Sequence, residues 1–161
     1  MTLREILRVK GTKVHSIHPT ASLDEVVQKL VRHNIGSLVV CEDDDPREMV
    51  GIITERDILR ACAANNTTFD QLHAGDCMST KLVTGALSDS VEDIMGMMTE
   101  HRVRHLPVMQ DGSMVGIISI GDVVKAQHDE LTMENHYLKN YIHGDVDETS
   151  SFALFVRNAP R

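Results

Sequence analysis

Two segments of the chain carry apolar residues at helical spacing behind a serine. The apolar residues occupy the i, i+3, i+4 and i+7 positions of 23–30 after Ser22, and of 91–98 after Ser90. Serine is a favoured N-cap residue, and this spacing places the apolar side chains on one face of a helix. We therefore expect two amphipathic helices, each with one buried face.

Short apolar runs follow each helix and predict two β-hairpins. The runs span 37–41 and 49–53 in the first hairpin, and 105–109 and 114–118 in the second. Asp111-Gly112 is a strong signal for a tight turn, whereas a longer loop joins the first pair of runs. A further helix is expected after each hairpin, and a short strand is expected ahead of each first helix, at 13–17 and 81–84.

The two hairpins end in the same sequence, so the chain contains an internal repeat. Met-Val-Gly-Ile-Ile occurs at 49–53 and at 114–118, and each copy is followed by a hydroxyl residue and, three positions later, an aspartate. These pairs are Thr54 with Asp57 and Ser119 with Asp122. Neither copy can bury much core alone, so we expect one α/β module in which two β-α-β-β-α repeats pack together.

The repeat divides the chain into five parts. They are an N-terminal helix at 1–11, repeat 1 at 12–61, a linker at 62–80, repeat 2 with an extended last helix at 81–143, and a tail at 144–161. The last helix is expected to stop at Gly144, because glycine commonly follows the end of a helix. Within the tail, the apolar residues of 152–156 predict one docked strand.

Composition disfavours nucleic-acid binding, export and membrane insertion. A net charge of −8 repels polyanions, and an aromatic content of 3% leaves few platforms for stacking bases. The three cysteines show no ligand spacing, so neither a disulfide framework nor a zinc site is expected. The N-terminus lacks a signal-peptide run, and no apolar stretch is long enough to span a membrane. We expect a soluble cytoplasmic protein that does not contact membranes.

The doubled unit resembles stand-alone tandem pairs of CBS (cystathionine beta-synthase) domains, or Bateman modules, of the small bacterial type. The resemblance rests on Gly-Ile-Ile-(Thr/Ser)-x-x-Asp in both repeats and on His-Arg-Val-Arg-His-Leu-Pro-Val at 101–108, and it extends from about residue 3 to 142. It implies a tandem CBS pair with pseudo-twofold symmetry that binds AMP, ADP, ATP, NAD or S-adenosylmethionine in clefts between the repeats. It also implies a homodimer. Val124, Leu131 and Leu138, at seven-residue spacing on the last helix, predict a stripe that is buried against the protein's own core or against a second subunit.

The same resemblance assigns candidate binding residues, each with a chemical reason. Ribose hydroxyls donate well to a carboxylate, and the ribose candidates are Asp57, Asp122, Thr54 and Ser119. The phosphate candidates, chosen by charge and by position in the motif, are Arg56, Arg104 and His105. The candidates for an adenine pocket are Val14, Ile35 and Gly36 in one cleft and Leu82 and Val103 in the other.

Each assignment has a structural alternative. The two hydroxyl and aspartate pairs also match the cap and first-turn acid of a helix N-terminus. Arg60 and Lys125 lie three residues after the aspartates and suit ion pairs with them, so they are not site candidates. Arg104 also suits a solvated strand entrance. The nine histidines include no HExxH pattern, and metal binding is not expected.

The sequence predicts a regulatory protein that is not an enzyme. It contains no GxSxG motif, no P-loop and no paired acids at a catalytic spacing. The leading hypothesis is a sensor of energy or redox state, whose bound nucleotide biases its assembly or an unidentified regulated protein. The alternative is a ligand-free oligomeric scaffold or protein-interaction module. The clefts should be unequal, because Ile120-Gly121 in repeat 2 replaces Glu55-Arg56 in repeat 1.

Overall fold

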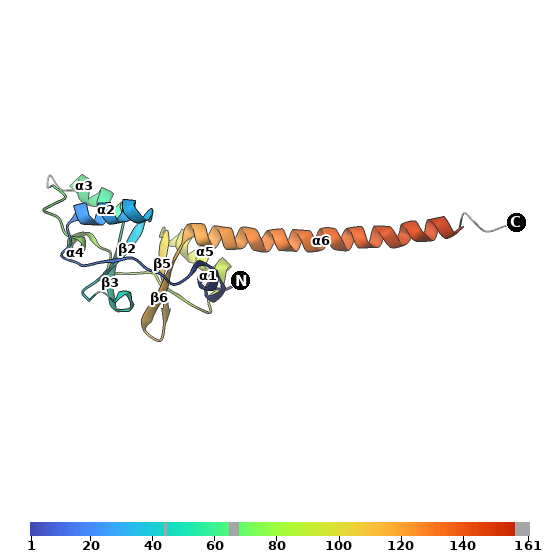
Figure 1. The fold of residues 1–161 in the computed structure, drawn as a ribbon, viewed down its shortest axis with the longest axis horizontal. Coiled ribbons are helices and arrows are strands. Elements are labelled where there is room, and N and C mark those ends of the chain that lie inside the picture. Colours follow the sequence, from blue (N-terminus) through green and yellow to red (C-terminus); the bar gives the residue numbers. More distant parts are fainter. Residues whose placement is uncertain (44, 65–67, 157–161) are drawn as a thin grey trace.

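The chain folds into two three-stranded sheets, one for each repeat (Figure 1). A computed structural model describes residues 1–43, 45–64 and 68–156, with side chains up to residue 142. In each sheet the first strand runs parallel to the second and the second antiparallel to the third. The strands are β1 (Ser16–Ile17), β2 (Ser37–Cys41) and β3 (Met49–Thr54) in one sheet, and β4 (Gly85–Ala86), β5 (His105–Gln110) and β6 (Ser113–Ser119) in the other. The predicted α/β class and the repeated unit are confirmed.

The helices begin where the sequence offers caps. Ser22 accepts a hydrogen bond from the N–H of Glu25, and Ser90 accepts one from the N–H of Asp93, as expected for N-cap residues. The helices are α1 (Leu3–Lys10), α2 (Leu23–His33), α3 (Glu55–Ala64), α4 (Ala74–Cys77), α5 (Val91–Glu100) and α6 (Ile120–Val156), and a short 3-10 helix, η1 (Pro46–Glu48), lies in the first hairpin loop.

Apolar side chains form three clusters, which place the two sheets face to face. One cluster lies between the first sheet and its helices, and includes Leu38 and Ile53. A second lies between the other sheet and its helices, and includes Leu106 and Ile118. The third joins the opposite faces of both sheets through Val39, Ile52 and Met114. Both faces of each sheet are therefore covered, and the repeats form one packed body, as expected from their small size.

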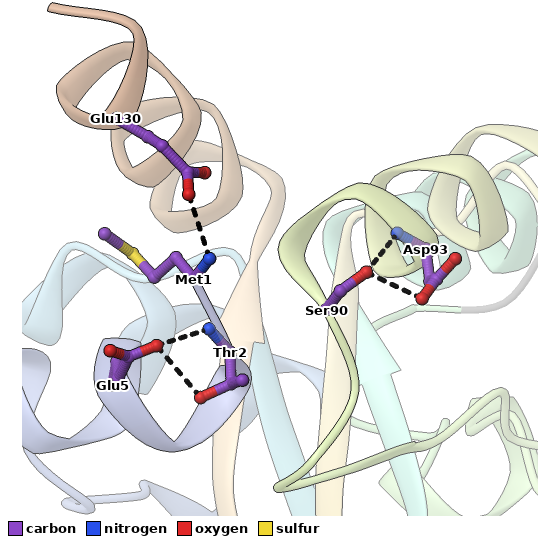
Figure 2. A network of polar contacts seen from close by, with 6 residues as sticks. All are labelled: Met1, Thr2, Glu5, Ser90, Asp93 and Glu130. Atoms are coloured by element: carbon purple, nitrogen blue, oxygen red, sulfur yellow. Dashed lines mark hydrogen bonds and ion pairs between the residues drawn. The ribbon is translucent and has the colours of Figure 1, made fainter. Parts of the chain in front are cut away.

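The N-terminal helix α1 packs against the second repeat rather than the first. Leu3, Ile6 and Leu7 belong to the same apolar cluster as the buried face of α5. Figure 2 shows the polar contacts around this junction: the Met1 ammonium donates to Glu130 of α6, and Thr2 donates to Glu5 in a capping box. The first repeat is covered in the corresponding place by the linker, in which Ala74 of α4 is fully buried.

The glycine shared by both repeats explains how α1 and the linker approach the hairpins. A Cβ atom on Gly51 would lie 2.6 Å from Sδ of Met78, and one on Gly116 would lie 2.8 Å from Cδ2 of Leu7. Both distances are shorter than ordinary contacts of a Cβ atom, so a larger residue would force Met78 or Leu7 to shift. The glycine of the Met-Val-Gly-Ile-Ile string thus leaves space on each hairpin, which the linker fills in repeat 1 and α1 fills in repeat 2.

Three boundaries differ from those expected. Strand β1 occupies only the end of the predicted 13–17 segment, and β4 begins one residue after the predicted 81–84 segment. Helix α6 does not stop at Gly144 but continues to Val156, so 152–156 is helical and the predicted docked strand is wrong. A glycine inside a helix costs only about 1 kcal/mol, which the flanking helical sequence can offset. Residues 157–161 of the predicted tail lie outside the described residues.

Helix α6 extends far beyond the packed body (Figure 1). Its first turns contribute the buried Val123 and Ala126 to the second core. Further along, Leu131 and Leu138 are exposed. Over the described residues, no helix has the combination of length and apolar character needed to cross a membrane.

Candidate functional site

A pocket opens between the repeats at the start of α3. It has a volume of about 210 Å³ and is lined by residues of both copies. Repeat 1 contributes Gly36, the end of β3 and the first turns of α3. The rest of the lining comes from Ser79, 81–83, 101–105 and Pro107. Because typical ligand pockets measure roughly 300–1,000 Å³, a nucleotide-sized ligand here would extend to the pocket mouth. We call this site the Asp57 pocket.

The helix cap engages one carboxylate oxygen of Asp57 and leaves the other outside the cap. Its Oδ2 atom accepts hydrogen bonds from the N–H of Thr54 (2.9 Å) and from the Thr54 hydroxyl (2.7 Å). Its Oδ1 atom has weaker neighbours, the Ser79 hydroxyl at 3.4 Å and the Arg60 guanidinium at 3.9 Å. The side chain of Asp57 is buried, whereas that of Arg60 is 72% exposed. Since a carboxylate oxygen accepts more than one hydrogen bond, Oδ1 retains capacity for a ligand hydroxyl.

The lining of the pocket is positively charged although the protein is acidic. It includes five cationic side chains against two carboxylates: Arg56, Arg60, Lys81, Arg102 and Arg104 against Glu55 and Asp57. The whole chain has a net charge of −8. A local excess of arginine in such a chain creates a field that attracts anions, and guanidinium groups suit phosphate in particular.

An arginine of repeat 1 also ties the two repeats together at this pocket. Nη1 of Arg56 donates to the carbonyl oxygen of Arg102 at 2.8 Å. Arg102 adopts a left-handed conformation with φ of 54°, as Asn34 does at the equivalent place after α2. Arginine is less suited than asparagine to this region, so the contact from Arg56 supports an unfavourable backbone geometry at the pocket wall.

His105 lies over Gly36, where the two repeats meet. A Cβ atom on Gly36 would lie 3.0 Å from Cε1 of His105. Burial lowers the pKa of His105, and the positive charge of Lys10 lowers it further, while Glu55 and Asp122 act in the opposite direction. His105 is therefore mainly neutral at pH 7 and offers one N–H donor to a ligand.

The second aspartate is in a different environment, which we call the Asp122 site. Oδ2 of Asp122 accepts from the N–H of Ser119 (2.8 Å) and from its hydroxyl (2.7 Å), which repeats the cap seen at Asp57. Lys10 at the end of α1 forms an ion pair with the same oxygen. Burial of Asp122 raises its pKa, but the hydrogen bonds from Lys10 and Ser119 together outweigh burial and bring the pKa below its usual value.

The structure gathers most of the predicted site residues into one place. The candidates in the Asp57 pocket are Thr54, Arg56, Asp57, Arg104, His105, Gly36, Leu82 and Val103. Gly36 was expected in a different cleft from Leu82 and Val103, and this division is wrong because the two repeats face each other across the pocket. Val14 and Ile35 do not line it: Val14 packs between the sheets and Ile35 against the first core. Ser119 and Asp122 lie apart from it, at the Asp122 site.

Two of the structural alternatives proposed from the sequence, the helix caps and the ion pair of Arg60, are present as well, whereas Asp122 pairs with Lys10 and not with Lys125 among the described residues. The Thr54 and Ser119 pairs do form helix caps, so their hydroxyls are committed to the aspartates. Arg60 does pair with Asp57, but it also lines the pocket. The three-residue spacing predicted the ion pair of Arg60 with Asp57 but did not predict that Arg60 lines the pocket.

Sequence reasoning named Leu82 in the segment that enters β4 but missed its neighbours. Ser79, Lys81 and Val83 also line the pocket, and Ser79 belongs to 62–80, which was predicted to be only a linker. A backbone bridge between Ser79 and Ile52 fixes this segment against β3. No local pattern marks such a contact, because it joins residues far apart in the chain.

Histidines and carboxylates do not gather into a metal site in the part of the chain described. No group of three or more His, Cys, Asp or Glu side chains is placed to hold an ion among these residues. His15 stacks on His33 instead, with ring centroids 4.0 Å apart. Burial lowers the pKa of His15, and the nearby His33 lowers it further, so the stack is favoured with a neutral ring.

Comparisons with known proteins agree with this geometry. The family model of the CBS domain matches the chain twice, over residues 2–64 and 74–129. The mitochondrial CBS domain-containing protein CBSX3 of Arabidopsis thaliana is 34% identical over 149 residues, which cover 89% of this chain and 72% of that protein.

Solved structures show the same arrangement. A CBS-domain containing protein from Agrobacterium tumefaciens superimposes with a TM-score of 0.73 at 35% identity, covering 79% of this chain and 99% of that one. A CBS domain protein from Pyrobaculum aerophilum, solved in complex with AMP, gives a TM-score of 0.65 at 30% identity, covering 76% of this chain and 89% of that one. The first match of the family model includes α1 and the second begins at α4, so both docking segments belong to the recurring unit.

Proposed function

Because this chain belongs to the CBS-domain family and contains the domain twice, we propose that it is a non-catalytic regulatory module that binds an adenine nucleotide in the Asp57 pocket. The observation that carries the proposal is the basic pocket between the repeats of an acidic chain. The buried carboxylate of Asp57, which has spare acceptor capacity, and the exposed guanidinium of Arg60 both line it. The related protein solved with AMP supports the choice of ligand.

The residues of the pocket match the parts of a nucleotide. Oδ1 of Asp57 would accept from a ribose hydroxyl, and Leu82 and Val103 would contact the adenine. Arg56, Arg104 and the neutral His105 would bind phosphate. A ligand in this position would contact both repeats, and would stabilise whichever relative arrangement of the repeats it binds more tightly. Regulation of a partner protein by energy or redox state would follow from such a preference.

A binding experiment separates ligand recognition by Asp57 from helix capping. Isothermal titration of AMP, ADP, ATP, NAD and S-adenosylmethionine should identify at least one ligand, which should also raise the melting temperature with concentration. Asp57→Asn should then weaken binding by roughly ten- to a hundredfold, because charge-assisted hydrogen bonds contribute about 1.5–3 kcal/mol. The wild type should bind the 2'-deoxy form of the ligand less tightly than the ribose form. The Asp57→Asn variant should bind the two forms with about equal affinity.

The chain offers a matched control in α5. Asp93 accepts from the Ser90 hydroxyl at 2.6 Å in the same cap arrangement (Figure 2), but it is not part of the pocket lining. Asp93→Asn should cost stability and leave nucleotide affinity unchanged. Equal affinities for the wild type and Asp57→Asn would assign Asp57 to capping alone, and no response to any nucleotide would favour the ligand-free scaffold.

We also propose that the protein is a homodimer and that α6 takes part in the contact. Val124, Leu131 and Leu138 recur every seven residues along this helix and are 55%, 55% and 62% exposed. Such a stripe of exposed aliphatic side chains is unusual on a monomer. A second copy of the same helix presents the same spacing, so two stripes can interdigitate.

A further inference from the structure

The two hairpins are covered differently at equivalent positions. In repeat 1, Ser79 of the linker covers the hairpin beside Asp57. Its N–H donates to the carbonyl oxygen of Ile52 at 2.8 Å, and its hydroxyl donates to Oδ1 of Asp57 at 3.4 Å. Both donors are uncharged, and the hydroxyl contact is long. A ligand hydroxyl can therefore replace it at little electrostatic cost.

In repeat 2, one ammonium group contacts both the corresponding carbonyl and the corresponding aspartate. The repeat places Ile117 and Asp122 where Ile52 and Asp57 stand in repeat 1. Nζ of Lys10 donates to the carbonyl oxygen of Ile117 at 3.0 Å and to Oδ2 of Asp122 at 2.5 Å. Lys10 thus covers the carbonyl that corresponds to the one covered by Ser79, and it brings a full positive charge to the aspartate, at the oxygen that also accepts from Ser119.

We infer that Lys10 closes the Asp122 site to ribose ligands, so that each chain binds one nucleotide, in the Asp57 pocket. The inference rests on the proposed function, because it requires that an aspartate in this motif accepts ribose hydroxyls. It identifies Lys10 as the residue that decides which of two equivalent aspartates is available.

Charge and burial explain why the ammonium prevails over a ribose hydroxyl. The side chains of Lys10 and Asp122 are 33% and 24% exposed, so water screens their attraction only in part. A hydroxyl donor that displaced Lys10 would exchange an ion pair for a hydrogen bond from a neutral donor, so the carboxylate would lose its attraction to a full positive charge. It would also leave the ammonium without its carboxylate. At the Asp57 pocket the nearest cation is Arg60, at 3.9 Å, and its exposed side chain is free to turn toward solvent or a phosphate.

The backbone around Lys10 fixes the ammonium at this place. Lys10 is the last residue of α1, and the buried Leu7 one turn earlier packs against Gly116 of the same hairpin. The following residue, Gly11, ends the helix with a positive φ of 91°. The lysine is therefore presented by a docked helix end and does not depend on a flexible loop.

Counting bound nucleotides tests the inference. The Lys10→Met variant keeps the aliphatic stem and removes the charge. The control is Arg8→Met, which removes a cation of the same turn of α1 that has no ion pair with Asp122. With AMP as the probe, isothermal titration should give one site per chain for the wild type and Arg8→Met, and two for Lys10→Met. Adding Asp57→Asn to Lys10→Met should leave one weakened site and one site of unchanged affinity.

The possible outcomes separate this inference from the proposed function. Two sites in the wild type, or one in Lys10→Met, would overturn closure by Lys10 while leaving nucleotide binding intact. No AMP binding by any of the proteins would overturn both. If the melting temperature of Lys10→Met shows that its fold is disturbed, Lys10→Gln keeps a donor for the Ile117 carbonyl and should give the same count of two.

Discussion

A single hydrogen atom on Gly36 leaves room for the imidazole of His105, and this contact sets the shape of the pocket wall. A methyl group at that position would approach Cε1 to 3.0 Å and Nε2 to 3.3 Å. Both atoms belong to a ring that β5 holds at its first residue. The ring is half-buried and lies over Gly36, so an added methyl group would push it out of its present position.

We therefore expect Gly36→Ala to displace His105 and weaken nucleotide binding. Overpacking at such contacts costs about 1–3 kcal/mol of stability, and the displaced imidazole should reduce AMP affinity severalfold. Gly96→Ala is the control: Gly96 lies inside α5 with no atom within 4 Å of an added Cβ, so it should gain up to about 1 kcal/mol. Denaturant unfolding and titration with AMP measure the two effects. Equal behaviour of both variants would contradict the proposed contact.

At the scale of elements, α6 has two roles in different parts of its length. Its first turns belong to the second core through Val123 and Ala126, whereas Leu131 and Leu138 face outward. The seven-residue spacing keeps these outward residues on one side of the helix. Met133 is also exposed but lies two residues from Leu131, about 200° around the helix at 100° per residue.

Replacing Leu131 and Leu138 together by serine should dissociate the proposed dimer. The change removes the aliphatic stripe, and burial of each leucine contributes about 1.5–3 kcal/mol. Light scattering coupled to gel filtration should show a dimer for the wild type and a monomer for the double variant at micromolar concentration. Met133→Ser, outside the stripe, should remain dimeric. A monomeric wild type would remove the dimer proposal and leave the stripe without an assigned partner.

At the scale of the whole molecule, α1 joins the start of the chain to its second half. Leu7 is buried in the second core and touches Gly116, whereas Val9 on the same helix is 87% exposed. Leu7→Ala should cost about 2–5 kcal/mol by leaving a cavity, and Val9→Ala should stay within about 0.5 kcal/mol. Hydrogen exchange should show a greater loss of amide protection in β6 than in β2. A larger loss in β2 would contradict the assignment of α1 to repeat 2.

Local pattern predicted what local interactions determine. The two repeats, the helices behind Ser22 and Ser90 and the hydroxyl and aspartate caps all follow from neighbouring residues, and all are present. Most candidates for the site also meet in one pocket, because the recurring motif places them there.

Contacts between distant segments could not be predicted in the same way. The docking of α1 on repeat 2, the place of Ser79 beside Asp57 and the bond from Lys10 to Asp122 join residues separated by 22 to 112 positions. Hydrophobic spacing carries no information on such partners, since a helix with one apolar face fits either repeat equally well. The continuation of α6 beyond Gly144 was also not predicted. A single glycine commonly marks the end of a helix, but here the helical sequence on both sides of it continues α6 to Val156.

The docking of α1 on the second repeat also determines the order in which the protein can be completed on the ribosome. Leu3, Ile6 and Leu7 are synthesised before the residues that cover them, which extend to Ala126. At about 5–20 residues per second, this apolar face waits on the order of 10 s for its cover. The first repeat needs nothing beyond α4 for its own cluster, so it can fold while the nascent helix is still unpaired. Chaperones that recognise exposed apolar helices should therefore bind this chain at α1, during translation of repeat 2.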